Sequence, residues 1–234
     1  MSSQSCDCSP AVLNLCVVLD QSGSMQPIQA STQKTLQELI KSQKGSETKL
    51  TLLTFNEQVT CVVDKQSLAG ATVLTLSRPT GGTALYDAVG NAINRFDEKE
   101  AVFMAVITDG LDNESSGFTA AQVADLVRAR SNWSFVFYAA NQDSKVVGAQ
   151  MGFVNTQDFQ FSSRGMREIS QSASRSCDAY RLSQQFSQPP PSQPPPSQPP
   201  PSQPPPSYPP TPLYQTLTPP PAFQPPAYKG ERGG

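Results

Sequence analysis

VLNLCVVLDQSGS, residues 12–24, joins a continuous apolar run to a cluster of oxygen-bearing side chains. The run Val12–Leu19 has the pattern of a strand that is covered on both faces, as in a parallel sheet. Asp20, Ser22 and Ser24 follow at i, i+2 and i+4, with a glycine between the two serines. This spacing lets the backbone curl so that three oxygens face one point. Oxygen-only ligands of this kind suit a hard divalent cation such as Mg²⁺ or Mn²⁺.

Two further oxygen-bearing motifs lie where such a site needs them. Gly81-Gly82-Thr83 is expected to open the second long helix, and Asp109-Gly110 follows a second apolar strand pattern at 101–108. Each piece also has a plainer explanation: the hydroxyl residues could cap helices, and Asp-Gly could form an ordinary turn. Those explanations do not predict that all the pieces occur in this order on these elements. The sequence therefore predicts a metal site formed by Asp20, Ser22, Ser24, Thr83 and Asp109.

Together these motifs resemble the metal-ion-dependent adhesion site of a von Willebrand factor A (vWA) domain, and the resemblance covers residues 10–183. It implies that Ser22, Ser24 and Thr83 coordinate the ion directly through hydroxyl oxygens. It also implies that Asp20 and Asp109 act mostly through ordered waters and hold the hydroxyls in place. Segments 108–110 (TDG) and 137–143 (FYAANQD) resemble the short cytoplasmic members of this family.

Strand patterns alternate with helix patterns along residues 10–183. Alternation with continuous apolar strands predicts an α/β fold, a doubly wound, mostly parallel, Rossmann-like sheet. A β-rich pair separated by Asn56-Glu57 predicts a hairpin that adds one antiparallel edge strand. Ligands bind such sheets at the carboxyl ends of the strands. The expected strands are 12–19, 49–55, 58–63, 101–108, 134–140 and 158–162.

The composition excludes several classes of function. The chain of 234 residues has a net charge of −2 and contains no histidine. Without histidine, Ser–His–Asp and Cys–His catalysis are excluded and a catalytic zinc site is not expected. The sequence contains no run of Lys or Arg that would favour binding of nucleic acid. It also contains no phosphate-binding glycine loop. We therefore expect a protein that is not an enzyme.

The chemistry of the predicted site indicates a receptor for an acidic side chain. Neutral hydroxyls donate little charge to the cation, so the ion keeps a replaceable water that an Asp or Glu of a partner can displace. We expect an adaptor that binds proteins through Mg²⁺ or Mn²⁺. One alternative is a metal-dependent hydrolase or phosphotransfer accessory protein, with Asp112 or Glu114 as general base instead of plain loop acids. The other is a structural domain whose hydroxyls only cap helices.

The chain divides by composition into three parts. Residues 1–9 are expected to form a flexible arm and residues 10–183 the vWA domain. In 184–234 a proline-rich tail is expected to be disordered, since 20 of the 23 prolines lie beyond Gln188. The unit QPPPS occurs four times in 188–207 and favours polyproline II. No signal peptide and no apolar run of the roughly 20 residues that span a bilayer appear. Five cysteines, an odd number, agree with a reduced, cytoplasmic protein.

The tail contains two matches to Pro-Pro-x-Tyr, the pattern that WW domains bind. One consists of Pro205, Pro206 and Tyr208, and the other of Pro225, Pro226 and Tyr228. The tail is therefore expected either to bind a WW-domain protein or to act as a spacer.

Overall fold

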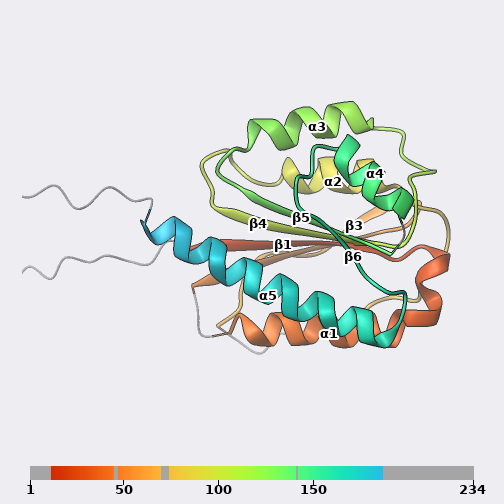
Figure 1. Cartoon of the computed structure of the whole chain (residues 1–234), viewed down its shortest axis with the longest axis horizontal. Helices are drawn as coiled ribbons and strands as arrows, with labels where there is room; N and C mark the ends of the chain where they lie inside the picture. The colour runs from red at the N-terminus through yellow and green to blue at the C-terminus, as the bar shows by residue number, and fades with distance from the viewer. Residues whose placement is uncertain (1–11, 45–46, 70–73, 141, 187–234) are drawn as a thin grey trace, which may run out of the picture. The chain divides into compact units, whose positions relative to one another are not determined.

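The central feature of the fold is one six-stranded sheet in the order β3-β2-β1-β4-β5-β6. The computed structural model describes residues 12–44, 47–69, 74–140 and 142–186 (Figure 1). Neighbouring strands are parallel except for the β2–β3 pair, so the predicted α/β fold with an antiparallel edge is confirmed. The strands are β1 (Leu13–Asp20), β2 (Thr48–Phe55), β3 (Val59–Ser67), β4 (Val102–Thr108), β5 (Ser134–Ala139) and β6 (Thr156–Asp158).

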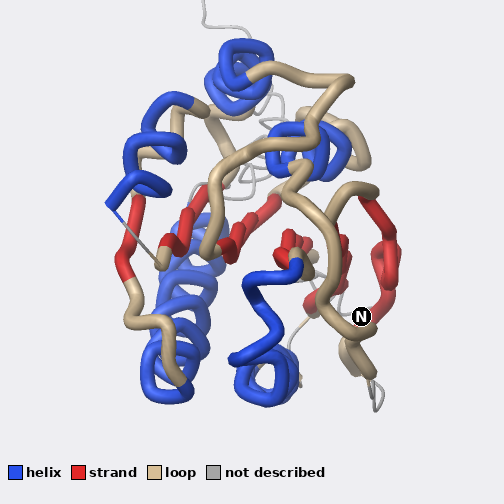
Figure 2. The backbone as a smooth tube through the Cα atoms, turned by 90° about the vertical axis from the view of Figure 1, so that its right-hand side faces the viewer, coloured by secondary structure: helices blue, strands red, loops and turns tan. Residues whose placement is uncertain are grey.

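Helices cover both faces of this sheet. Figures 1 and 2 show α1 and α5 on one face and α2, α3 and α4 on the other. None of the helices in the described ranges is both long enough and apolar enough to cross a membrane. The bounds are η1 (Gly23–Ile28), a 3₁₀ helix, α1 (Gln29–Ser42), α2 (Leu85–Ile93), α3 (Ala120–Ala129), α4 (Gln142–Gln150) and α5 (Ser163–Phe186).

The two helical layers explain why the central strands are apolar along most of their length. In β1, Leu15 and Val17 pack into the core that α1 and α5 cover. Cys16 and Val18, which point the other way, pack into the core that α2 and α3 cover. Because side chains alternate between the faces of a strand, a strand buried on both faces leaves few positions for polar side chains, and the buried Asn14 donates to the carbonyl of Ala101 (3.2 Å). All eight residues of β1 are buried.

The expected strand at 158–162 was wrong in its position. The last strand, β6, spans Thr156–Asp158, and its pairing with β5 ends where Asp158 lies opposite Ala139. The amide of Phe159 still donates to the carbonyl of Ala139 (3.0 Å). Beyond that point β5 has ended, so residues 160–162 have no neighbouring strand and turn into α5.

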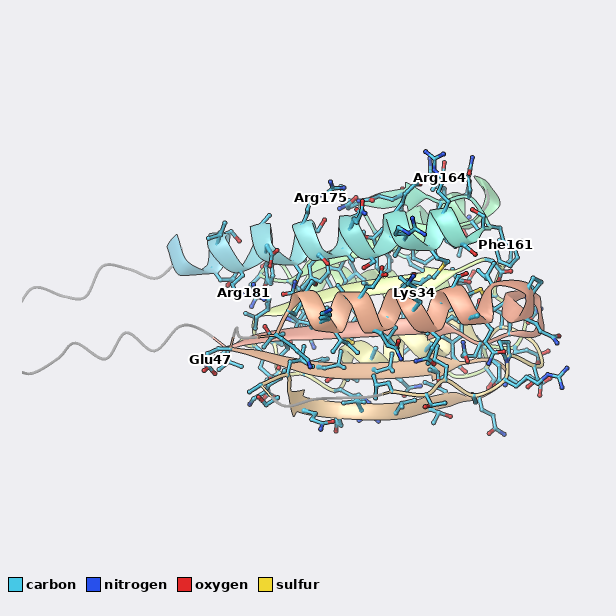
Figure 3. All side chains as sticks on the ribbon, turned by 90° about the horizontal axis from the view of Figure 1, so that it is seen from below. Lys34, Glu47, Phe161, Arg164, Arg175 and Arg181 are labelled. Carbon is cyan, nitrogen blue, oxygen red and sulfur yellow. The ribbon has the colours of Figure 1, made fainter. Side chains whose placement is uncertain are left out.

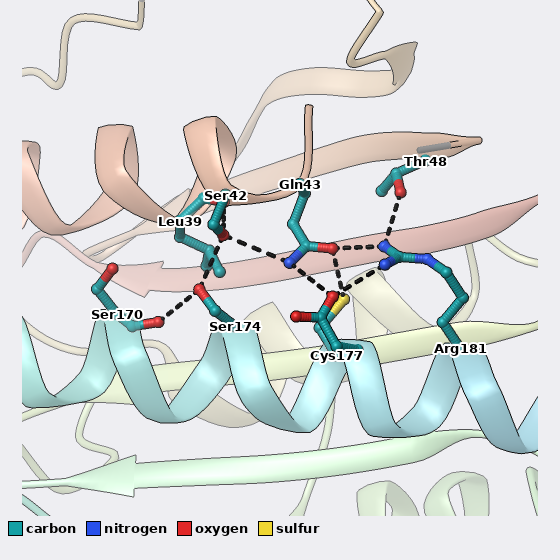
Figure 4. A network of polar contacts seen from close by, with 9 residues as sticks. Leu39, Ser42, Gln43, Thr48, Ser170, Ser174, Cys177 and Arg181 are labelled. Atoms are coloured by element: carbon teal, nitrogen blue, oxygen red, sulfur yellow. Dashed lines mark hydrogen bonds and ion pairs between the residues drawn. The ribbon is translucent and has the colours of Figure 1, made fainter. Parts of the chain in front are cut away.

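A network of polar side chains ties α5 to α1 and β2 (Figures 3 and 4). One terminal nitrogen of the Arg181 guanidinium donates to the side-chain oxygen of Gln43, which is buried, and to Thr48 Oγ1 (3.0 Å). The other terminal nitrogen forms an ion pair with Asp178 Oδ1 (2.9 Å). The guanidinium thus ties α5 to the end of α1 and the start of β2, more than 130 residues earlier in the sequence.

We expect the Arg181→Ala variant to lose about 1–3 kcal/mol of unfolding free energy, because its hydrogen bonds are charge-assisted and partly buried. The matched control is Arg175→Ala, on the exposed side of the same helix (Figure 3), for which a change within about 0.5 kcal/mol is expected. Urea unfolding of both variants checks this. Equal losses in the two variants would show that the network does not hold α5 in place.

Candidate metal centre

The predicted site residues gather at the carboxyl ends of β1 and β4, two neighbouring strands in the middle of the sheet. Asp20 is the last residue of β1, and Asp109 follows the last residue of β4. From β1 the chain continues to β2 on one side, whereas β4 lies on the other side. This is the topological switch point at which open α/β sheets bind ligands. In Figure 1 the η1 turn marks this end of the sheet, and Figure 2 is viewed from it.

Asp20 is fully buried and held by two hydrogen bonds. Its Oδ1 accepts from the amide of Ser22 (2.7 Å), and its Oδ2 accepts from Thr108 Oγ1 (2.6 Å). Burial raises the pKa of Asp20 to about 6, although both hydrogen bonds act in the opposite direction. An ionised carboxylate at this place is therefore costly to bury and would be stabilised by a nearby cation.

The hydroxyl groups of Ser22 and Ser24 connect β1 to Asp109. Ser22 Oγ lies 3.1 Å from Ser24 Oγ, and Ser24 Oγ donates to Asp109 Oδ1 (2.9 Å). Ser22 is buried and Ser24 exposed, so the row of oxygens runs from the interior to the surface. Burial also raises the pKa of Asp109. Four of the five predicted residues thus form one continuous chain of contacts.

Thr83 lies next to this chain of contacts. Gly81-Gly82-Thr83 was expected to open the second long helix, but α2 begins at Leu85 and Thr83 lies in the loop before it. Its side chain is almost completely buried. A methyl group added at Gly110 would lie 3.3 Å from Thr83 Oγ1, so this hydroxyl faces the residue directly after Asp109. The amide of Gly23 donates to the carbonyl of Gly81 (3.0 Å), which joins the loop to the serine segment.

Helix capping does not account for these hydroxyls in the described part of the chain. Ser22 occupies the N-cap of η1, but its side chain makes no capping hydrogen bond. The N-cap of α2 is Ala84, so Thr83 lies one residue too early. The hydrogen bonds of Ser22 and Ser24 instead lead toward Asp109. This geometry speaks against the purely structural alternative.

The sequence-based prediction missed the residues that support the site. Thr108, an ordinary strand residue by pattern, binds Asp20. Asp112 accepts from the amide of Tyr86 (3.2 Å) and from the Ser115 hydroxyl. A general base needs a free carboxylate, and these bonds fit a loop acid better. A threonine at the end of a strand, or an Asp in the loop after it, gives no sign in the sequence that it supports a site until its tertiary neighbours are known.

The donor set fits a hard divalent cation. It contains three hydroxyls and two carboxylates, which are the oxygen ligands that Mg²⁺ and Mn²⁺ accept, and it lacks the nitrogen and sulfur ligands typical of zinc. Across the residues that the structure describes, no group of three or more His, Cys, Asp or Glu could hold a metal. A cation at this end of the sheet would accordingly depend on the hydroxyl oxygens.

Comparison with known families agrees with this architecture. The family model described as "VWA domain containing CoxE-like protein" matches residues 10–152, more than half of the chain. The chain belongs to this VWA family. No curated protein matches the sequence.

Solved structures show the same VWA fold at low sequence identity. Proximal thread matrix protein 1 of the mussel byssus is 17% identical with a TM-score of 0.53, over 71% of this chain and 46% of that protein. The von Willebrand factor type A protein from Catenulispora acidiphila is 13% identical with a TM-score of 0.54 (71% and 43%). The ArnB paralog VWA2 from Sulfolobus acidocaldarius is 12% identical with a TM-score of 0.53 (70% and 44%). The VWA chain described here thus spans less than half the length of each, and the likeness concerns the fold alone.

Proposed function

We propose that this VWA domain is a protein-interaction module that binds Mg²⁺ or Mn²⁺ through Ser22, Ser24 and Thr83, with Asp20 and Asp109 as outer carboxylates. The ion then binds an Asp or Glu side chain of a partner protein. The observation that carries this proposal is the chain of contacts from Asp20 through the two serines to Asp109, which joins residues 85 or more positions apart. The position of these contacts at the switch point of the sheet also supports the proposal.

The hydrogen bonds of Asp20 support the assignment of roles. Both of its carboxylate oxygens already accept bonds, from Ser22 and Thr108, so they are fixed behind the hydroxyls. A cation held by neutral hydroxyls keeps most of its charge, and this charge is available to a ligand from outside. When bound, the ion would supply electrostatic attraction for a carboxylate at the rim of the crevice.

Two glutamates beside the proposed site predict a further property of the partner. A methyl group at Gly81 would lie 2.9 Å from Glu57 Oε1, and one at Gly82 would lie 2.5 Å from Glu114 Cγ. Both glutamates therefore lie beside the residues that lead into Thr83, and both are exposed. Opposite charges across an interface favour the correct partner and like charges disfavour others. We expect an acidic ligand residue flanked by Lys or Arg.

A selection of peptides tests this function. We expect the full-length protein to enrich, from a random peptide library with Mn²⁺, sequences that contain Asp or Glu beside basic residues. Replacement of that acid by Asn or Gln should weaken binding at least tenfold, because the bond to the ion requires a negative charge. The Thr83→Ala variant serves as the control and should enrich none of these sequences. Equal enrichment in EDTA would contradict the proposal.

A metal-dependent hydrolase or phosphotransfer accessory protein is the alternative class. Its candidate bases are Asp112, whose Oδ1 accepts two hydrogen bonds, and Glu114, which is exposed next to Gly82. Neither observation favours catalysis, so we place binding first.

The proline-rich tail would add a second partner. We propose that residues 184–234 bind a WW-domain protein through Tyr208 and Tyr228 with their preceding prolines, and that the protein is a cytoplasmic adaptor. The Pro-Pro-x-Tyr matches and the arm at residues 1–9 lie outside the described residues. With both sites engaged in one assembly, the effective concentration would increase modest affinities.

A further inference from the structure

The first turn of α2 obtains its capping groups from a distant loop. Its own N-cap residue, Ala84, has no side-chain oxygen. The loop after β4 supplies acceptors instead: Ser115 Oγ accepts from the amide of Asp87 (3.0 Å), and just ahead of the helix Asn113 Oδ1 accepts from the amide of Thr83 (2.7 Å). Asp112 adds the bond to the Tyr86 amide. Backbone donors that helix ends leave unpaired are thus satisfied across 26 or more residues of sequence.

Asp87, within the first turn of α2, makes the reverse connection. Its carboxylate accepts from three successive backbone amides of the same loop, those of Ser116 (3.0 Å), Gly117 (3.0 Å) and Phe118 (2.7 Å). Hydrogen bonds to an ionised acceptor are short and about twice as strong as neutral ones. The loop caps the helix, and the helix anchors the loop.

This reciprocal connection joins the two parts of the proposed metal site that come from different elements. Thr83 lies immediately before α2, and Asp109 begins the loop that Asp87 holds. Thr83 Oγ1 lies close to the Gly110 position, so the two parts of the site keep this proximity only while loop and helix keep a fixed separation. A displacement of the loop by about one ångström would move the segment at Gly110 away from the Thr83 hydroxyl, and small errors of that size weaken a metal site.

We propose that Asp87 is a positioning residue of the proposed metal site, which anchors the loop at Ser116–Phe118 and so holds the segment Asp109-Gly110 beside Thr83. The inference rests on the proposed function, since it assigns a role at that same site. The hydrogen bonds of the Asp87 carboxylate lead to the backbone of the loop. Its effect on the ion passes through the loop backbone, as is usual for residues that orient metal ligands.

Titration of the full-length protein with Mn²⁺ by calorimetry tests this role. We expect the Asp87→Ala variant to bind Mn²⁺ at least tenfold more weakly than the wild type. Asp87→Asn should fall between the two, because the amide oxygen can still accept from the Gly117 and Phe118 amides while its NH₂ group cannot accept from Ser116. Thr119→Ala is the matched control: Thr119 caps α3 directly after the loop, and its hydrogen bonds go to Gln122 within its own helix.

Hydrogen exchange in EDTA and urea unfolding separate positioning from general stability. In Asp87→Ala the amides of Ser116, Gly117 and Phe118 should exchange faster, and so should that of Thr83. Thr119→Ala should lower the urea midpoint to a similar extent and yet bind Mn²⁺ within twofold of the wild type. Wild-type Mn²⁺ affinity in Asp87→Ala, or an equal loss of affinity in Thr119→Ala, would overturn this inference and leave the proposed function standing. A wild-type chain that takes up no Mn²⁺ would overturn the proposed function, and this inference with it.

Discussion

The Asp20→Asn variant should lose the rise in melting temperature that Mg²⁺ or Mn²⁺ produces in the wild type, while melting in EDTA at or above the wild-type temperature. A ligand that binds only the native state stabilises it by about 2.7 kcal/mol at 100 times its Kd. In a domain of this size that corresponds to roughly 5–10 °C. We expect Asn to weaken the metal by a factor of about 100, since the carboxylate charge behind Ser22 is removed.

The result in EDTA follows from the burial of Asp20. Burial raises the pKa of this carboxyl to about 6, so at neutral pH the folded protein holds a costly ionised group that an amide of the same shape replaces without charge. Asn can also still accept from the Ser22 amide and donate to the Thr108 hydroxyl. Loss of the metal effect without loss of the fold would therefore identify a ligand site. A full metal-induced rise in Asp20→Asn would contradict the site assignment.

The Phe103→Ala variant should lose about 3–5 kcal/mol of unfolding free energy, the range for removal of a large core side chain. Phe103 is completely buried in β4, where it pairs with Leu15 of β1 and Ser134 of β5. Its ring lies 6.5 Å from the ring of Tyr180 on α5, centroid to centroid. Truncation leaves a cavity between the central strands and α5 that the rigid sheet cannot fill.

Phe161→Ala is the matched control, because the same atoms are removed from a phenylalanine that is 39% exposed, ahead of α5 (Figure 3). We expect it to lose less than about 1 kcal/mol. Guanidinium chloride unfolding in EDTA measures both losses. The increase in unfolding free energy on addition of Mn²⁺ should be the same in both variants as in the wild type, since neither residue lies at the proposed site. Similar losses in the two variants would contradict the assigned core.

The central strands were predictable because a strand that is buried on both faces has a mostly apolar sequence. β1 and β4 are mostly apolar, and Asp20 and Asp109 appear where these strands end. The three-residue strand β6 has no such pattern, because its existence depends on the end of β5 beside it. Expected strand residues 159–162 were wrong for that reason.

The residues of the proposed metal site could be named in advance, but the residues that hold them in place could not. Asp20, Ser22 and Ser24 are close in sequence, so local spacing alone suggests that their oxygens converge. Asp87 and the loop at 112–118 meet only in the folded chain, and a carboxylate in the first turn of a helix is common for other reasons. Their reciprocal hydrogen bonds follow from tertiary contact and leave no periodic pattern.

The most direct test of the central claim is Mn²⁺ binding by the full-length protein, followed by the loss of the free-ion signal in electron paramagnetic resonance. We predict saturation at one Mn²⁺ per chain, displacement of the ion by excess Mg²⁺, and binding about 100-fold weaker in Asp20→Asn. Absence of saturable binding in the wild type at millimolar Mn²⁺, or unchanged binding in Asp20→Asn, would contradict a metal site at the ends of β1 and β4.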